Sequence, residues 1–350
     1  MKKVIGLILA AIVIFAGTFF AFLTVESRPV DASDDQKVFV TVEEGSGASQ
    51  IAQMLGEKGL IRNELAFKLK SKFSGKAGSF QAGAYAVSKS MSTASIIDMI
   101  ADGRTAAKSF RIIEGLSLDK VASQLASQDI CTEKEFFKEV ENGKFDHPFM
   151  KYLPEGPTRL EGFLYPDTYT ISLDGGAHEA IEAMLSNFDS KVTEEYYEKA
   201  KKRGTDIYKI VTTASIVERE ASFSEDKPKV ASVIYNRIDK DMFLQMDSII
   251  AYIHKEDKVI ASYSDIAVES DYNTYKNKGL PPGPICSPGL EAIDAALSPA
   301  DTKYLFFVNS PKLDGSLTFC ENETQFSKAK SDFEKAYADY LKEHPEKSDD

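Results

Sequence analysis

The sequence predicts an α+β fold in which a single N-terminal transmembrane helix precedes a small subdomain and a larger mixed α+β domain. Three observations support this prediction. Residues 4–23 carry no charge and are almost entirely apolar. From about residue 38, short alternating runs are each followed by a polar turn and an amphipathic helical pattern. The later sequence mixes helical periodicity with loop-rich stretches and short aromatic or β-branched runs.

The apolar run at 4–23 is long enough to cross a bilayer as one helix. Lys2 and Lys3 precede it, which predicts that residues 1–3 are cytoplasmic and that the chain after the helix is extracytoplasmic. A cleaved signal peptide is the alternative, but it requires a shorter apolar core and a small-x-small cleavage site, which this sequence lacks. We therefore expect an uncleaved, single-pass anchor in the cell (inner) membrane, followed by a polar linker at 24–37.

Composition bears on the kind of partner and on the state of the cysteines. The formal net charge is −12, which argues against a polyanionic partner such as nucleic acid. The three cysteines are Cys131, Cys286 and Cys320. Since three is an odd number, at least one thiol is expected to be free, and a Cys286–Cys320 bridge and three isolated thiols both stay open.

The small subdomain is predicted from a loosely repeated pattern. Residues 39–55, 85–100 and 110–125 each read as a strand, a polar turn with a Ser or Thr suited to an N-cap, and an amphipathic helix. A further helical segment lies at 64–71. The result is a strand–helix–helix–strand unit over about 38–90.

The larger domain is predicted to contain several helices and two late strands. Helical patterns cover 195–203, 210–220 and 229–240, and a charged amphipathic helix starts at about 328. Between them, residues 262–289 are rich in loop-forming residues and end in a rigid Pro/Gly segment of a kind that often lines sites. Strands are expected at 304–308 and 317–319, and the end of the chain, 341–350, is expected to be disordered.

The segment 210–220 carries the first candidate for chemistry. Wound as a helix, it places Glu218 on a face of small, mostly apolar residues, and Glu220 on another face. The residues that share the face of Glu218 are Val211, Ala214, Ser215, Ala221 and Ser222. An apolar setting raises the pKa of a carboxyl group, which keeps it protonated as a proton donor near neutral pH. The alternative is a helix Glu paired with a nearby Arg or Lys, and this segment alone favours that alternative.

Other chemistries find little support in the sequence. None of the four histidines shows metal-ligand spacing such as HExxH, so we expect no metal site. The sequence contains no GxSxG elbow, no P-loop and no GxGxxG motif that opens a helix. A nucleophilic Cys286–His254 pair has no support beyond residue type.

Six motifs in series nevertheless resemble one known family. They are Glu161-Gly-Phe-Leu-Tyr-Pro-Asp-Thr-Tyr169, Ala214-Ser-Ile-Val-Glu-Arg-Glu220, Lys229-Val-Ala-Ser-Val-Ile-Tyr-Asn-Arg237, Leu244-Gln-Met-Asp247, Tyr272-Asn-Thr-Tyr275 and Gly279-Leu-Pro-Pro-Gly283. Each motif is weak alone, but their order is specific, and the chain resembles the YceG-like family of MltG-type endolytic murein transglycosylases over most of its length. The N-terminal unit also looks like a LysM peptidoglycan-binding module.

The resemblance implies cleavage of the MurNAc–GlcNAc glycosidic bond in nascent peptidoglycan strands, without a metal or organic cofactor. The first Glu of the family's E-x-E pair corresponds to Glu218, which agrees with the helical-face argument. Peptidoglycan synthases are implied as partners. The chain also departs from the family pattern. A Gly-His-x-Phe motif of many members corresponds to Gly315-Ser-Leu-Thr-Phe319, and the family's Arg-Leu-Gln is Phe243-Leu244-Gln245.

The expected mechanism uses Glu218 first as general acid towards the glycosidic oxygen and then as general base towards the MurNAc C6 hydroxyl, which leaves a 1,6-anhydroMurNAc end. Ordinary hydrolysis is the rival reaction and requires a second carboxylate. Its candidates are Asp247, Glu161 and Asp167, although capping or Arg pairing is the favoured explanation for the last two. The polar residues that we expect to bind the glycan are Gln245, Asp247, Asn273 and Tyr275.

Two further functions stay open. One is a catalytically inactive, membrane-tethered scaffold that binds peptidoglycan, and the other is an aminodeoxychorismate lyase, a label that also circulates for this family and that a membrane anchor argues against. The expected domains are a cytoplasmic start (1–3), an anchor (4–23), a linker (24–37), a LysM-like subdomain (38–108), a YceG-like catalytic domain (109–340) and a disordered tail (341–350).

Overall fold

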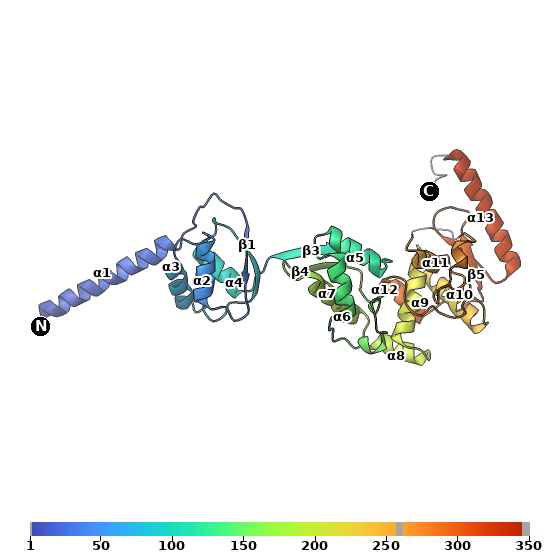
Figure 1. The fold of residues 1–350 in the computed structure, drawn as a ribbon, viewed down its shortest axis with the longest axis horizontal. Helices are drawn as coiled ribbons and strands as arrows, with labels where there is room; N and C mark the ends of the chain where they lie inside the picture. The colour runs from blue at the N-terminus through green and yellow to red at the C-terminus, as the bar shows by residue number, and fades with distance from the viewer. Residues whose placement is uncertain (1, 257–261, 345–350) are drawn as a thin grey trace. The chain divides into compact units, whose positions relative to one another are not determined.

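The computed structural model describes residues 2–256 and 262–344. Within these ranges the chain forms helices and short two-stranded sheets, so the predicted α+β class is confirmed. The chain divides into two compact units, 1–108 with 170–176 and 109–169 with 177–350 (Figure 1).

The N-terminal apolar helix, α1 (Lys2–Glu26), is longer than the segment 4–23 that the sequence predicts. Its part Leu9–Glu26 is long and apolar enough to cross a membrane, judged by length and composition. Because the helix continues to Glu26, it includes the first three residues of the predicted linker.

The rest of the first unit has the predicted strand–helix–helix–strand order. Its elements are β1 (Val38–Val42), α2 (Ala48–Glu57), α3 (Glu64–Phe73), β2 (Gly83–Val87) and α4 (Thr93–Ala101). The two strands pair antiparallel, with Val38 opposite Val87 and Val42 opposite Gly83. Side chains from both strands and all three of these helices form one apolar cluster, in which Leu55, Phe67 and Tyr85 are fully buried.

Polar caps set where two of these helices begin. The Asn63 side chain accepts hydrogen bonds from the backbone N–H groups of Leu65 and Ala66 at the start of α3. Ser92 accepts one from the N–H of Ser95 at the start of α4. Such caps satisfy N–H groups that the first helical turn leaves without partners.

The strands β3 (Ala107–Arg111) and β4 (Thr168–Ser172) pair as a second two-stranded sheet, along which the chain passes between the units. The helices that follow β3 and β4 are α5 (Leu118–Ser127), α6 (Glu133–Asn142), α7 (Gly176–Lys191), α8 (Glu194–Lys202), α9 (Ile207–Glu220), α10 (Lys227–Asp239), α11 (Asp247–His254) and α12 (Leu290–Leu297). Two short 3-10 turns lie at Met150–Tyr152 and Asp265–Ala267.

Helix α9 is central to the second unit. It packs against α8, α10, α11 and α12 (Figure 1), and every residue from Ile210 to Val217 is buried. A helix that is buried all round is usually apolar all round. The Thr and Ser residues of α9 can be buried there because their hydroxyls donate to carbonyls of the preceding turn, as Thr212 does to Tyr208.

The C-terminal hairpin pairs β5 (Phe306–Asn309) with β6 (Leu317–Cys320), with Phe306 opposite Cys320. Helix α13 (Glu323–Glu343) packs on it through stacked rings of Phe306 and Phe326. This helix starts before residue 328 because Asn322 caps it by accepting from the Gln325 N–H. It covers the first three residues of the predicted tail 341–350, and positions 345–350 lie outside the described residues.

Candidate active site

Glu218 lies in the last turn of α9, where the helix leaves the core. Asp206 caps the start of the helix by accepting from the Lys209 N–H at 2.9 Å, and the helix ends at Glu220 because Ala221 has an extended backbone. Ala221 and Ser222 therefore do not continue the small-residue face that helical periodicity predicts. The Glu218 side chain is only 9 % exposed.

The carboxylate of Glu218 is held by an ion pair. The Lys227 ammonium donates to Oε1 at 3.1 Å and to Oε2 at 3.2 Å, and the Gly289 backbone N–H donates to Oε2 at 3.0 Å. The apolar surroundings predicted from the helical face are therefore wrong, and the alternative of a helix Glu paired with a Lys is confirmed. The residues of α9 on this face are small and mostly apolar, but the carboxylate is contacted by Lys227 and Gly289, which lie outside the helix.

Lys227 is the first residue of α10 and is only 7 % exposed on its side chain. Its ammonium lies 3.8 Å from the more exposed carboxylate of Glu291. Burying a charged pair is costly, and removing one partner leaves the other charge uncompensated. The pair thus fixes the Glu218 carboxylate at one end of α9.

The Pro/Gly segment that the sequence predicts to line a site does approach Glu218. It lies along α9, since the Ile285 N–H donates to Ser215 Oγ at 3.0 Å and the Cys286 thiol donates to the Ser215 carbonyl at 3.3 Å. Its last residue, Gly289, precedes α12 and supplies the N–H on Glu218. None of the three cysteines forms a disulfide: Cys286 and Cys320 are buried, and Cys131 is partly exposed.

A small cleft lies beside this end of α9. It is lined by Gly115, Ser117, Asp119, Lys120, Arg219, Ser248, Ala251, Tyr252, Lys255, Glu256 and Ile285. The cleft is adjacent to Glu218, because its lining residue Gly115 lies beside that side chain: a Cβ added to Gly115 would be 3.9 Å from Cγ of Glu218. Arg219 and Lys120 give its wall cationic groups, and Tyr252 gives it an aromatic ring.

Three of the residues predicted to bind glycan, Gln245, Asp247 and Tyr275, lie on neighbouring segments near Glu220. Asp247 is the first residue of α11 and accepts from the Tyr275 hydroxyl. The Ser248 N–H donates to Glu220 Oε1 at 3.4 Å. Burial raises the pKa of Tyr275, and Asp247 adds to this shift. Gln245 is exposed, at a positive φ of 52°, and its N–H donates to the Thr274 carbonyl.

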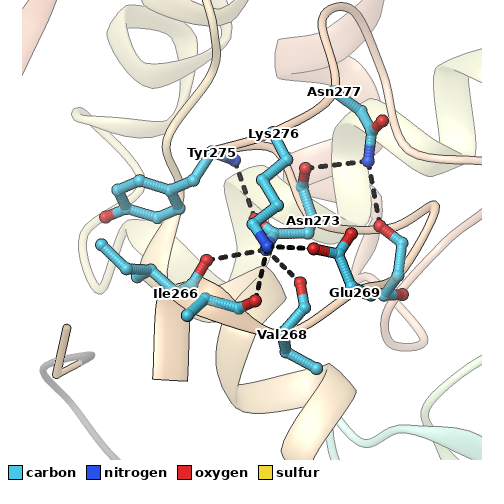
Figure 2. Close-up of polar contacts among 9 residues, drawn as sticks. Ile266, Val268, Glu269, Asn273, Tyr275, Lys276 and Asn277 are labelled. Carbon is cyan, nitrogen blue, oxygen red and sulfur yellow. Dashed lines mark hydrogen bonds and ion pairs between the residues drawn. The ribbon is translucent and has the colours of Figure 1, made fainter. Parts of the chain in front are cut away.

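Asn273, the remaining predicted contact, is fully buried within its loop. Figure 2 shows its amide nitrogen donating to the Ile266 and Val268 carbonyls, at 2.9 and 2.8 Å, while its amide oxygen accepts from the Tyr275 N–H at 3.0 Å. The side chain thus ties the loop before it to the residues after it. In this structure Asn273 orders the loop that carries Tyr275.

Glu161 and Asp167, the less favoured candidates for a second carboxylate, have structural contacts. Glu161 caps α5 by accepting from the Leu118 N–H at 3.0 and 3.1 Å, and it accepts from the Tyr252 hydroxyl at 3.2 Å. Asp167 accepts from the Thr168 N–H and the Asn187 amide. Capping, the favoured alternative, is confirmed for Glu161, and Asp167 makes the same kind of local hydrogen bond.

The buried carboxyl of Glu161 makes stability depend on pH. Burial is the main cause that raises its pKa from 4.5 to about 8. A carboxyl whose pKa is raised by folding contributes stability below its unfolded pKa and loses that contribution as pH rises through the folded value. We expect Glu161→Gln, which keeps an acceptor for Leu118, to flatten the fall in unfolding free energy between about pH 4.5 and 8.

Urea unfolding at several pH values within this window tests that expectation. Asp167→Asn is the matched control, because its pKa is lowered by the Thr168 N–H and the Asn187 amide, and its contribution is lost only as pH falls below the window. An identical pH slope for Glu161→Gln and the unaltered protein would contradict the assignment.

Sequence reasoning missed two residues of this site, Lys227 and Glu114. Glu114 follows β3 and lies against Gly289, where an added Cβ would come within 2.1 Å of its Oε1. Its segment reads in the sequence only as the turn after a strand. Lys227 reads only as one cation in a charged linker, so no spacing rule connects either residue with Glu218.

The segment that departs from the family's Gly-His-x-Phe pattern lies near the end of α9. Gly315 is close to Phe223 and Ser222, since an added Cβ would lie 3.6 and 3.9 Å from them.

Among residues 2–256 and 262–344, the structure groups no three His, Cys, Asp or Glu side chains as a metal ion would require.

Comparisons with known proteins agree with one another. The model of the YceG-like family matches residues 40–332. The chain is 34 % identical to the endolytic murein transglycosylase of Bacillus subtilis over 318 residues, which cover 87 % of each chain. It is 30 % identical to the protein of that name from Streptococcus pneumoniae serotype 2, over 91 % of this chain and 63 % of the pneumococcal one.

A solved structure is similar as well. The crystal structure of a yceG-like protein from Listeria monocytogenes is 32 % identical in sequence to this chain. The match has a TM-score of 0.58 and covers 83 % of this chain and 98 % of the Listeria chain.

Proposed function

Because the chain belongs to the YceG-like family, we propose that it is a membrane-anchored endolytic peptidoglycan transglycosylase. It cleaves the MurNAc–GlcNAc bond of nascent glycan strands and leaves 1,6-anhydroMurNAc ends. The observation that carries this proposal is the setting of Glu218. A carboxyl group of the central helix is held by Lys227 and Gly289 next to a cleft whose walls carry cationic, anionic and aromatic side chains.

Glu218 performs both proton transfers in this proposal. Protonated Glu218 gives its proton to the glycosidic oxygen as the bond to C1 breaks and positive charge develops on the sugar ring. The carboxylate that results then accepts the proton of the C6 hydroxyl as O6 bonds to C1. Lys227 and the Gly289 N–H stabilise that carboxylate, because both donate to it.

Helix α1 anchors the protein in the membrane, with its N-terminus in the cytoplasm, and the chain that follows α1 acts on the extracytoplasmic side. The first unit is LysM-like and binds glycan. Its strand–helix–helix–strand order supports this assignment. Tethering favours internal cuts close to the membrane surface, where peptidoglycan synthases release new strands.

The mass of the products tests the reaction. The full chain in detergent micelles is incubated with purified, uncrosslinked glycan strands, and the fragments are weighed by mass spectrometry. We expect fragments one water lighter than hydrolysis products. Reducing-end fragments would instead indicate a hydrolase, with Asp247 as the candidate second carboxylate, and bound but uncleaved glycan would indicate a scaffold.

A further inference from the structure

Helix α3 of the first unit carries an apolar stripe on its outer side. Leu65, Leu69 and Phe73 recur at every fourth residue, which aligns them along one side of the helix. Leu65 is 56 % exposed and Phe73 is 68 % exposed, whereas Phe67 is fully buried in the apolar cluster of the unit. Apolar side chains that line up in this way mark a surface for association.

The C-terminal end of the stripe contacts helix α1. The rings of Phe73 and Phe19 meet edge to face, with their centroids 6.1 Å apart. Phe19 belongs to the part of α1 that is long and apolar enough to cross a membrane. At a rise of about 1.5 Å per residue, Phe19 lies about 10 Å before Glu26, the last residue of α1. When α1 spans the bilayer, Phe73 therefore lies at the depth of the outermost acyl chains.

The segment that follows α1 is bound to the first unit. The Arg62 guanidinium donates to the Pro29 carbonyl at 2.8 Å and to the Val30 carbonyl at 3.1 Å. The Thr93 N–H donates to the Ser27 carbonyl at 3.1 Å. Because these bonds tie the segment to the residues before α3 and to the start of α4, the first unit stays next to the end of α1.

The charge of α3 suits the surface of a membrane. The helix contains Lys68, Lys70 and Lys72 and a single acidic residue, Glu64, although the chain as a whole has a formal net charge of −12. Lys72 is exposed and follows the same outer side as the apolar stripe. Basic amphipathic helices lie in the interface of bilayers that contain anionic lipid, with their apolar side chains towards the acyl chains and their cations among the headgroups.

We propose that α3 is an interfacial helix that docks the first unit on the outer surface of the bilayer beside α1. Leu65 and Phe73 enter the edge of the acyl region, and the lysines of α3 contact anionic phospholipid headgroups. The partner is lipid because the stripe continues from the side of the helix that crosses the membrane. This inference rests on the membrane anchoring in the proposed function. Docking holds the first unit where new glycan strands leave the membrane surface.

A tryptophan scan tests the proposal directly, because the chain contains no tryptophan of its own. Phe73→Trp and Leu65→Trp each place one indole on the stripe, and Phe39→Trp is the matched control on β1, where Phe39 is 51 % exposed. The full-length variants are reconstituted in vesicles of phosphatidylcholine and phosphatidylglycerol, with or without bromine on the acyl chains. We expect brominated lipid to remove most of the indole emission of the two α3 variants and little of that of Phe39→Trp.

Leu65→Trp gives the stricter result. Leu65 lies about 12 Å from Phe73 along the axis of α3, so its indole reaches lipid only if the whole helix lies along the surface. Emission that acrylamide quenches and brominated lipid does not quench would place the stripe in water and overturn the inference. Emission protected from both quenchers would mean that protein, such as a second copy of this chain, covers the stripe, and would overturn it as well.

Lipid charge tests the contribution of the lysines. In vesicles of phosphatidylcholine alone, we expect brominated lipid to quench Leu65→Trp less than in the mixed vesicles. Adding Lys72→Gln to Leu65→Trp is expected to reduce the quenching in mixed vesicles in the same direction. Equal quenching in both kinds of vesicle and in both variants would contradict the contact with anionic headgroups.

Two further observations separate this inference from the proposed function. If alkaline carbonate releases the unaltered chain from the vesicles, α1 does not span the bilayer and the proposed anchoring fails. If the chain stays in the vesicles and releases anhydro product, but the indole of Leu65→Trp remains in water, the proposed function stands and the docking of α3 is wrong.

Discussion

Glu218→Gln abolishes glycan cleavage while the protein stays folded. The Gln side chain has nearly the same shape, and its carbonyl oxygen accepts the Gly289 N–H that now bonds to Oε2. It has no proton to give to the glycosidic oxygen and cannot take one from the C6 hydroxyl. Because both transfers are lost, we expect turnover to fall by roughly 10³-fold or more.

The release of anhydro-ended fragments measures this effect, and circular dichroism checks the fold. Some loss of thermal stability is expected, since the buried ammonium of Lys227 loses its closest carboxylate. Glu220→Gln is the matched control on the same helix, because Glu220 bonds to Ser248 instead, and we expect it to cost less than about tenfold. More than a tenth of normal turnover in Glu218→Gln would remove Glu218 from the centre of the mechanism.

The helix that carries Glu218 could be predicted from periodicity, but the surroundings of its carboxylate could not. Helical spacing over 210–220 places Glu218 and Glu220 on different faces, and the structure shows them with different partners. Lys227 lies nine residues away and Gly289 71 residues away. Contacts across such separations depend on tertiary packing, which periodicity does not encode.

The first unit was easier to predict because local signals agree there. Alternating residues in β1 match its buried and exposed faces, and Asn63 and Ser92 begin helices as their residue types suggest. In contrast, the role of Asn273 depends on how its loop closes. An amide in a polar loop suggests a sugar contact, and only the closed loop shows that backbone groups occupy it.

Asn273→Ala is expected to destabilise the second unit strongly. The substitution leaves the Ile266 and Val268 carbonyls and the Tyr275 N–H without their present partner, and the Asn273 site is fully buried. Unsatisfied buried groups of this kind cost about 1–3 kcal/mol each and are not fully additive. We therefore expect a loss of about 2–4 kcal/mol in unfolding free energy, measured by urea denaturation.

Asn277→Ala is the matched control in the same loop. Asn277 also donates to backbone carbonyls, those of Ser270 and Asn273, but its side chain is exposed (Figure 2). Water replaces its hydrogen bonds when it is removed, so we expect a loss below about 1 kcal/mol. If Asn273→Ala instead unfolds like the unaltered protein and only raises KM for glycan strands, its amide contacts the substrate. The loop would then be ordered by other groups, such as the ion pair between Lys276 and Glu269.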